Sequence, residues 1–254
     1  MRKILVLILS ALYTSCSEPK PKVVYDNAQQ QTEAEDPIIF DSTAIVVASL
    51  PIHFDSTSYL IHPIGQHSAG NRGVSVYMSS YDSGTSGVAV AYRNGHEISG
   101  NLDNLKFQHV DSASFTSLTK RQIKIRSFTF LRSVFDSTQK QLLLYSLTDK
   151  DSNKDRKLDS EDIESLYISS INGSNFKKLS PDLQELVEWQ VIDVQKRLYI
   201  ITSEDIDKNG EFNRIDQLHY FYVDLAGENI NVIEYYPIEK IDSVPTSAIA
   251  NRKK

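Results

Sequence analysis

Two stretches of the chain place oxygen-bearing side chains at the spacing of a calcium-binding loop. Each runs for 12 residues, over 151–162 and 205–216, with carboxylates or amides at positions 1, 3, 5, 9 and 12. Calcium is a hard cation that takes six to eight oxygen ligands, and a loop of this kind adds a backbone carbonyl at position 7. The predicted ligands are Asp151, Asn153, Asp155, Lys157, Asp159 and Asp162 in the first loop, and Asp205, Asp207, Asn209, Glu211, Asn213 and Asp216 in the second.

The pattern resembles the calcium loops of EF-hand and dockerin proteins, with two departures. Position 12 is aspartate in both loops, where an EF-hand has a bidentate glutamate, so we expect weak sites with a Kd of ~10⁻⁴ M. Position 6 is Gly210 in the second loop but Arg156 in the first. A positive φ is expected at this sharp turn and is uncommon for a residue with a Cβ. The second loop is therefore predicted to be the better calcium site.

The two loops belong to an internal repeat. A shift of 54 residues aligns Leu144 with Leu198, Asp151 with Asp205, Tyr167 with Phe221 and Gly173 with Gly227. A single Asp/Asn-rich stretch could be an ordinary turn, because these side chains bond to their own backbone. Two such stretches in register favour calcium. A period of this length indicates stacked supersecondary units, with propellers among the candidates.

The loops are flanked by expected strands and not by the helices of an EF-hand. Apolar runs over 141–148 and 165–171 surround the first loop, and Asn172-Gly173-Ser174 predicts a hairpin turn before residues 176–181. This strand-turn-strand segment, ending in Leu179-Ser180-Pro181, resembles the repeat of TolB-type β-propellers. The resemblance covers residues 134–235 and implies a propeller-like fold with a binding or scaffolding role.

The fold class is predicted to be all-β. Further strands are expected over 43–48, 58–62, 73–78, 87–92, 105–110 and 122–130, most of them with alternating apolar and polar residues. Residues 37–245 have the length of one domain and of slightly under four repeats, so we expect a small or incomplete propeller, with a β-sandwich as the alternative. Three Phe-Asp-Ser-Thr motifs, beginning at Phe40, Phe54 and Phe135, are predicted to be turns, and a helical turn is expected within 181–189.

The N-terminus has the features of an export signal. Residues 1–15 combine a basic start with a short apolar run, and Cys16, the only cysteine, follows where a bacterial lipoprotein signal places its lipid-modified cysteine. Tyr13 replaces the usual leucine of that signal. Residues 16–36 are polar and are predicted to be a disordered tether, and residues 246–254 a polar tail. We expect an exported lipoprotein, anchored in the outer membrane of a Gram-negative bacterium.

The composition narrows the functional classes. The net charge of −6, which becomes more negative once Arg2 and Lys3 are removed with the signal, makes nucleic acid an improbable partner. The six histidines have no zinc-protease spacing, and the sequence contains no nucleophile elbow or phosphate-binding loop. The expected function is a calcium-binding module that binds a protein or glycan in the cell envelope. A hydrolase on a propeller scaffold is the alternative, and a calcium sensor is a third possibility.

Overall fold

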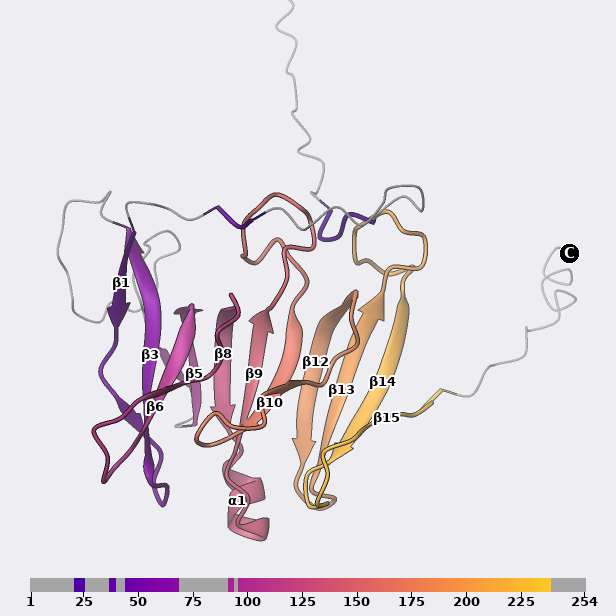
Figure 1. The fold of residues 1–254 in the computed structure, drawn as a ribbon. Coiled ribbons are helices and arrows are strands. Elements are labelled where there is room, and N and C mark those ends of the chain that lie inside the picture. The colour runs from indigo at the N-terminus through magenta and orange to yellow at the C-terminus, as the bar shows by residue number, and fades with distance from the viewer. Residues whose placement is uncertain (1–20, 26–36, 40–43, 69–90, 94–95, 239–254) are drawn as a thin grey trace, which may run out of the picture.

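A computed structural model describes residues 21–25, 37–39, 44–68, 91–93 and 96–238. These residues form three antiparallel sheets that stand side by side (Figure 1). The first sheet contains β1 (Ala44–Ala48), β2 (Ile52–His53), β3 (Tyr59–Ser68), β6 (Asn104–His109) and β7 (Thr116–Ser117). The second contains β4 (Ala91–Arg93), β5 (Glu97–Leu102), β8 (Lys124–Phe130), β9 (Leu142–Thr148), β10 (Ser165–Ser170) and β11 (Lys177–Lys178). The third contains β12 (Gln184–Ile192), β13 (Arg197–Glu204), β14 (Gln217–Asp224) and β15 (Val232–Glu234).

The middle sheet is buried on both faces, which explains why β9 is apolar at every position except Ser146 and Thr148. Leu143, Tyr145 and Leu147 point into a core shared with the first sheet. Leu142 and Leu144 point into a second core, shared with the third sheet. Successive side chains of a strand alternate between faces, so a strand with a core on each side must be apolar at nearly every position.

The 54-residue repeat corresponds to two four-stranded meanders. One consists of β8, β9, β10 and β11, and the other of β12, β13, β14 and β15, each with neighbouring strands in chain order. The first loop joins β9 to β10 and the second joins β13 to β14, the same connection in each meander. Both loops therefore lie at the same end of the strands, and α1 lies at the opposite end (Figure 1).

The turn predictions hold in part. Phe54-Asp55-Ser56-Thr57 is a turn between β2 and β3, closed by a 2.7 Å hydrogen bond from Thr57 Oγ1 to the Phe54 carbonyl. The third motif is different, because Phe135–Thr138 forms the last turn of a short helix, α1 (Arg132–Thr138), between β8 and β9. Val134 and Phe135 are buried, and Gln139 ends the helix at φ 62°. The motif at Phe40 includes residues outside the described ranges.

The helical turn predicted within 181–189 is wrong, because this segment starts β12. Leu183 has φ 60°, which breaks a right-handed helix before its first turn. The Ser180 hydroxyl accepts a hydrogen bond from the Leu166 amide of β10, which ties this segment to the middle sheet. Leu186, Trp189 and Val191 then pack into the core beside the middle sheet. Pairing along β13 and burial of these side chains outweigh the local helix signal.

The predicted all-β class is confirmed, with strands as the dominant element and α1 as the helix of the described ranges. Each of the three sheets is open in this part of the chain. The strand expected at 73–78, most of that at 87–92, the signal sequence with Cys16, and the tail at 246–254 lie outside the described residues. No helix among the residues described is long and apolar enough to cross a membrane.

Candidate metal centre

The two loops have the same backbone conformation at their special positions. Position 4 has a positive φ in both, 59° at Lys154 and 56° at Lys208. Position 6 does as well, 66° at Arg156 and 84° at Gly210. The left-handed conformation predicted for Arg156 is therefore confirmed, despite the cost of a Cβ at such a position.

The first aspartate of each loop accepts the same pair of backbone hydrogen bonds. Asp151 accepts from the amides of Asp155 at 3.2 Å and Arg156 at 2.7 Å. Asp205 accepts from the amides of Asn209 at 3.3 Å and Gly210 at 2.7 Å. In both loops the two bonds go to different carboxylate oxygens. The side chain at position 1 is thus fixed from inside the turn.

The last aspartate closes each loop in the same way. Asp162 Oδ1 accepts from the Ser152 amide at 2.8 Å, and Oδ2 accepts from the Asp159 amide at 3.1 Å. Asp216 Oδ1 accepts from the Ile206 amide at 3.3 Å, and Oδ2 from the Asn213 amide at 2.6 Å. Both aspartates are buried. A carboxylate buried at the end of each loop is tied to its start and its middle.

The remaining polar positions repeat one local motif, in which the side-chain oxygen accepts the backbone amide two residues further on. Such bonds shape the turn. The pairs are Asn153 with Asp155, Asp155 with Lys157 and Asp159 with Glu161 in the first loop, and Asp207 with Asn209, Asn209 with Glu211 and Asn213 with Ile215 in the second.

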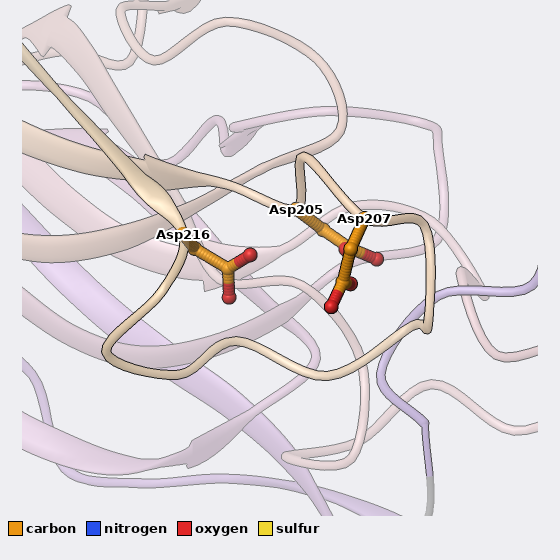
Figure 2. Close-up of side chains that lie close together, drawn as sticks. All are labelled: Asp205, Asp207 and Asp216. Carbon is orange, nitrogen blue, oxygen red and sulfur yellow. The ribbon is translucent and has the colours of Figure 1, made fainter.

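The second loop brings three of the predicted ligands together. Carboxylate oxygens of Asp205, Asp207 and Asp216 all lie within 4.8 Å of one another (Figure 2). The first loop has Asn153 at position 3 in place of Asp207, and it has aspartates at positions 5 and 9, where the second loop has Asn209 and Asn213. Three converging carboxylates are a hard, anionic oxygen set of the kind that calcium and magnesium bind. The donor chemistry of the second loop therefore fits a divalent cation.

The carboxyl groups of the two loops differ in acidity. Burial raises the pKa of Asp162 above its ordinary value, and this outweighs the hydrogen bonds from Asp159, Asn153 and Ser152. Burial acts in the same direction on Asp205, but there the hydrogen bonds from the Gly210 amide and the Tyr25 hydroxyl prevail, and the pKa is lowered.

A short N-terminal strap, residues 21–25, lies against both loops (Figure 1). The amides of Lys22 and Val23 donate to the Gly210 carbonyl, and the Val24 amide donates to the Ser152 carbonyl. Val23 is buried, with 3% of its surface exposed. The tether predicted over 16–36 is therefore wrong for these five residues. Five residues are too few to show a periodic pattern, and an extended segment held by loop carbonyls needs none.

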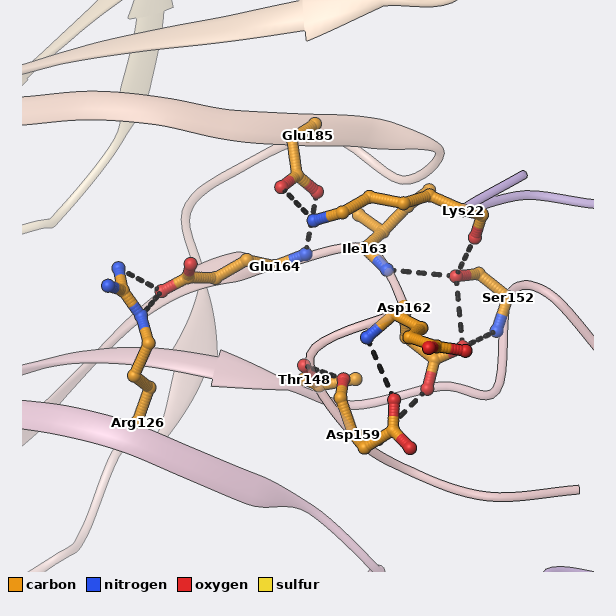
Figure 3. Close-up of polar contacts among 10 residues, drawn as sticks. Lys22, Arg126, Thr148, Ser152, Asp159, Asp162, Ile163, Glu164 and Glu185 are labelled. Atoms are coloured by element: carbon orange, nitrogen blue, oxygen red, sulfur yellow. Dashed lines mark hydrogen bonds and ion pairs between the residues drawn. The ribbon is translucent and has the colours of Figure 1, made fainter. Parts of the chain in front are cut away.

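The strap also joins the first loop to the third sheet (Figure 3). Lys22 Nζ forms an ion pair with Glu185 of β12 at 2.5 Å, and the other Glu185 oxygen accepts the Glu164 amide at 2.9 Å. The Ser152 hydroxyl donates to the Lys22 carbonyl at 2.6 Å and accepts from the Ile163 amide at 2.9 Å. These contacts connect the loop that contains Asp162 with the strap and, through Lys22 and Glu185, with β12 of the third sheet.

A hollow of about 270 Å³ lies beside the first loop. Its carboxylates are Asp159, Asp162 and Glu164, and its cations include Lys124 and Arg126. Arg126 forms an ion pair with Glu164 at 2.6 Å. Two of the three acids thus belong to the predicted calcium loop, and the third is paired.

Two of the histidines, His53 and His62, lie within hydrogen-bonding distance of different partners. His53 Nε2 lies 2.9 Å from the Thr57 carbonyl, and His62 Nε2 lies 3.1 Å from the side-chain oxygen of Gln108. The side chain of His67 lies outside the described residues.

No protein-family model matches the chain, and no curated protein matches it in sequence.

Proposed function

We propose that this protein is a calcium-stabilised, all-β binding module, with a propeller-like arrangement of its sheets and a lipid anchor at Cys16 in the cell envelope. The ligands would be the twelve residues at positions 1, 3, 5, 7, 9 and 12 of the two loops, with Lys157 and Glu211 contributing backbone carbonyls. Bound calcium would neutralise the crowded carboxylates and hold the strands on either side.

The observation that carries this proposal is the correspondence between the two loops. Their hydrogen bonds from positions 2, 5, 6, 7, 9 and 11 to the side chains at positions 1, 3, 5, 9 and 12 match one for one at a shift of 54 residues. Ordinary acidic turns need no such agreement. A shared ligand that requires six oxygens at fixed positions would explain it.

Two observations support the finer parts of the proposal. Four-stranded antiparallel meanders, repeated with a constant connection between their second and third strands, are the building units of propellers. Strands at both ends of each loop also favour a structural ion over a sensor, because an EF-hand sensor works by opening a pair of helices.

The hydrolase alternative has less support from the described residues. A glycoside hydrolase needs two carboxyl groups flanking the bond that is cleaved. In the hollow beside the first loop, Asp159 and Asp162 are predicted calcium ligands, and Arg126 holds Glu164. A partner that binds to a face of the sheets, a protein or a glycan, fits the arrangement better.

The loops contain a matched pair of residues that tests the calcium proposal. Position 3 is Asn153 in one loop and Asp207 in the other, so Asp207→Asn removes one carboxylate from the second loop and Asn153→Asp adds one to the first. Isothermal titration calorimetry of the full chain in detergent should show weaker calcium binding for Asp207→Asn and tighter calcium binding for Asn153→Asp than for the wild-type chain.

Thermal unfolding provides the second measurement. Calcium at 100 times its Kd adds about 2.7 kcal/mol to the free energy of unfolding, which corresponds to a rise of several degrees in Tm. Addition of a chelator should reverse the rise. If calcium changes neither the heat signal nor the Tm of the wild-type chain, the loops are acidic turns and the proposal is wrong.

A further inference from the structure

The strap is the segment of the described chain that contacts both predicted calcium loops. On the second loop, the Lys22 and Val23 amides donate to the Gly210 carbonyl at 2.7 and 3.3 Å. The Tyr25 hydroxyl donates to Asp205 Oδ2 at 3.0 Å, an oxygen that also accepts the Gly210 amide. The strap therefore contacts both the sharp turn of this loop and its first ligand.

On the first loop, the contacts centre on Ser152, at position 2. The Val24 amide donates to the Ser152 carbonyl at 2.8 Å, and the Ser152 hydroxyl donates to the Lys22 carbonyl at 2.6 Å. The amide of Ser152 donates to Asp162, the last ligand of the loop (Figure 3). One residue thus transmits the position of the strap to a predicted calcium ligand.

The fit between strap and loop is close at Gly210. A Cβ built on this residue would lie 2.5 Å from the Val23 carbonyl oxygen and 2.6 Å from Pro21 Cβ. The missing side chain therefore serves two purposes, the positive φ of the turn and the close approach of the strap. Arg156, at the same position of the first loop, carries a side chain, and the strap passes that loop at Ser152 instead.

We propose that the strap is a clasp whose docking and calcium binding strengthen each other, so that ion binding in the two loops orders residues 21–25. The inference rests on the calcium function proposed above and extends it. The physical reason is linkage. Asp205 and Ser152 take part both in the ligand arrangement and in the strap contacts, so a ligand that fixes either group lowers the entropy that the other interaction must remove. Coupling of this kind is reciprocal.

Hydrogen exchange of the full chain in detergent tests the first direction. The amides of Lys22, Val23 and Val24 are the ones that the loops protect, and mass spectrometry of N-terminal peptides reports on them. We expect calcium to slow their exchange by at least fivefold relative to chelator. In the Asp207→Asn variant, the effect should require higher calcium concentrations.

The variant Tyr25→Phe tests the reverse direction. It removes the hydroxyl that binds Asp205 and keeps the ring. We expect about a fivefold weaker calcium affinity, a fraction of the full value of a hydrogen bond to a charged group, because Asp205 still accepts the amides of Asn209 and Gly210. Tyr199→Phe is the matched control. The Tyr199 hydroxyl donates to Gln195 at 2.6 Å in the hairpin between β12 and β13, at the end of the strands away from the loops. It should leave the affinity unchanged.

The possible outcomes separate the two proposals. Calcium binding without a change in exchange at residues 22–24, or an unchanged affinity in Tyr25→Phe, would overturn the clasp and leave the calcium sites in place. Absence of calcium binding would overturn the calcium function and the clasp with it. The coupling would be established if calcium slows exchange at residues 22–24 of the wild-type chain, and if calcium binding is weaker in Tyr25→Phe but not in Tyr199→Phe.

Discussion

Arg156 and Gly210 occupy the same position of the two loops, and their amides donate over the same distance, 2.7 Å, to Asp151 and Asp205. Both have a positive φ. An arginine thus adopts a conformation that glycine adopts freely, because the hydrogen bonds of the loop require it. Strain at Arg156 is the main backbone difference between two otherwise matching sites.

Relief of this strain should stabilise the first loop. We predict that Arg156→Gly raises the free energy of unfolding by about 0.5–1 kcal/mol, since a left-handed residue with a Cβ costs about 1–2 kcal/mol and the flexibility of glycine offsets part of the gain. Urea unfolding measures the change. Lys157→Gly is the control, because Lys157 has no positive φ and should lose stability. A loss in both variants would show that Arg156 is not strained.

The repeat offers a second matched pair, Gly173 and Gly227. A Cβ on Gly173, which has φ 79°, would lie 2.4 Å from a ring carbon of Phe107 in the core. The nearest atom to a Cβ on Gly227 is 3.7 Å away. We predict that Gly173→Ala costs about 2–4 kcal/mol, from overpacking and strain, and that Gly227→Ala stays within about 0.5 kcal/mol. Equal losses in denaturant unfolding would contradict this reading of the turn after β10.

His219 should make stability depend on pH near neutrality. Its ring nitrogens lie 2.7 Å from Glu204 and 3.0 Å from Glu234, which connects β13, β14 and β15. Burial lowers the pKa of His219, but the hydrogen bonds and charges of the two glutamates outweigh it, and the pKa is raised. A group with a raised folded pKa contributes stability that is fully present below its unfolded pKa, about 6.5, and lost as the pH rises through the folded value.

We therefore expect the free energy of unfolding of the wild-type chain to fall between pH 6 and pH 8.5 relative to that of His219→Gln. The difference should be about 0.5–1 kcal/mol, typical of partly exposed ion pairs. Parallel curves for the two proteins would mean that the imidazole does not titrate in this range. Exchange of the β15 amides should follow the same trend, because Glu234 lies on that strand.

If Cys16 carries the lipid, the position of the strap indicates which end of the strands faces the membrane. Four residues lie between Cys16 and Pro21, and the five steps of chain from one to the other span at most ~18 Å. The loops should then lie close to the lipid headgroups. Arg214 is exposed in the second loop, and Val194, 90% exposed, lies in the hairpin at the other end of β13. Spin labels on Arg214→Cys and Val194→Cys in vesicles should be quenched by membrane-bound relaxation agents at Arg214 only. Equal quenching would exclude this orientation.

Local patterns in the sequence were sufficient for the loops. A 12-residue loop that gathers its oxygens must turn sharply at position 6. This requirement predicted the positive φ of Gly210 and of Arg156 from the spacing of the polar residues alone. The repeat and the alternating apolar residues likewise predicted an all-β chain, because a strand carries its burial pattern in consecutive residues.

Contacts between distant residues decided the rest. The segment after Pro181 became β12 because β13 and a core beside the middle sheet were available to it, and the strap docks because Gly210 and Ser152 present carbonyls more than a hundred residues away. Neither outcome leaves a signal within a short window of sequence. The sequence alone therefore determined the two loops, whose hydrogen bonds lie within twelve residues, and the all-β class. The tertiary structure decided what those elements pack against, since burial and pairing energies depend on partners that only the folded chain supplies.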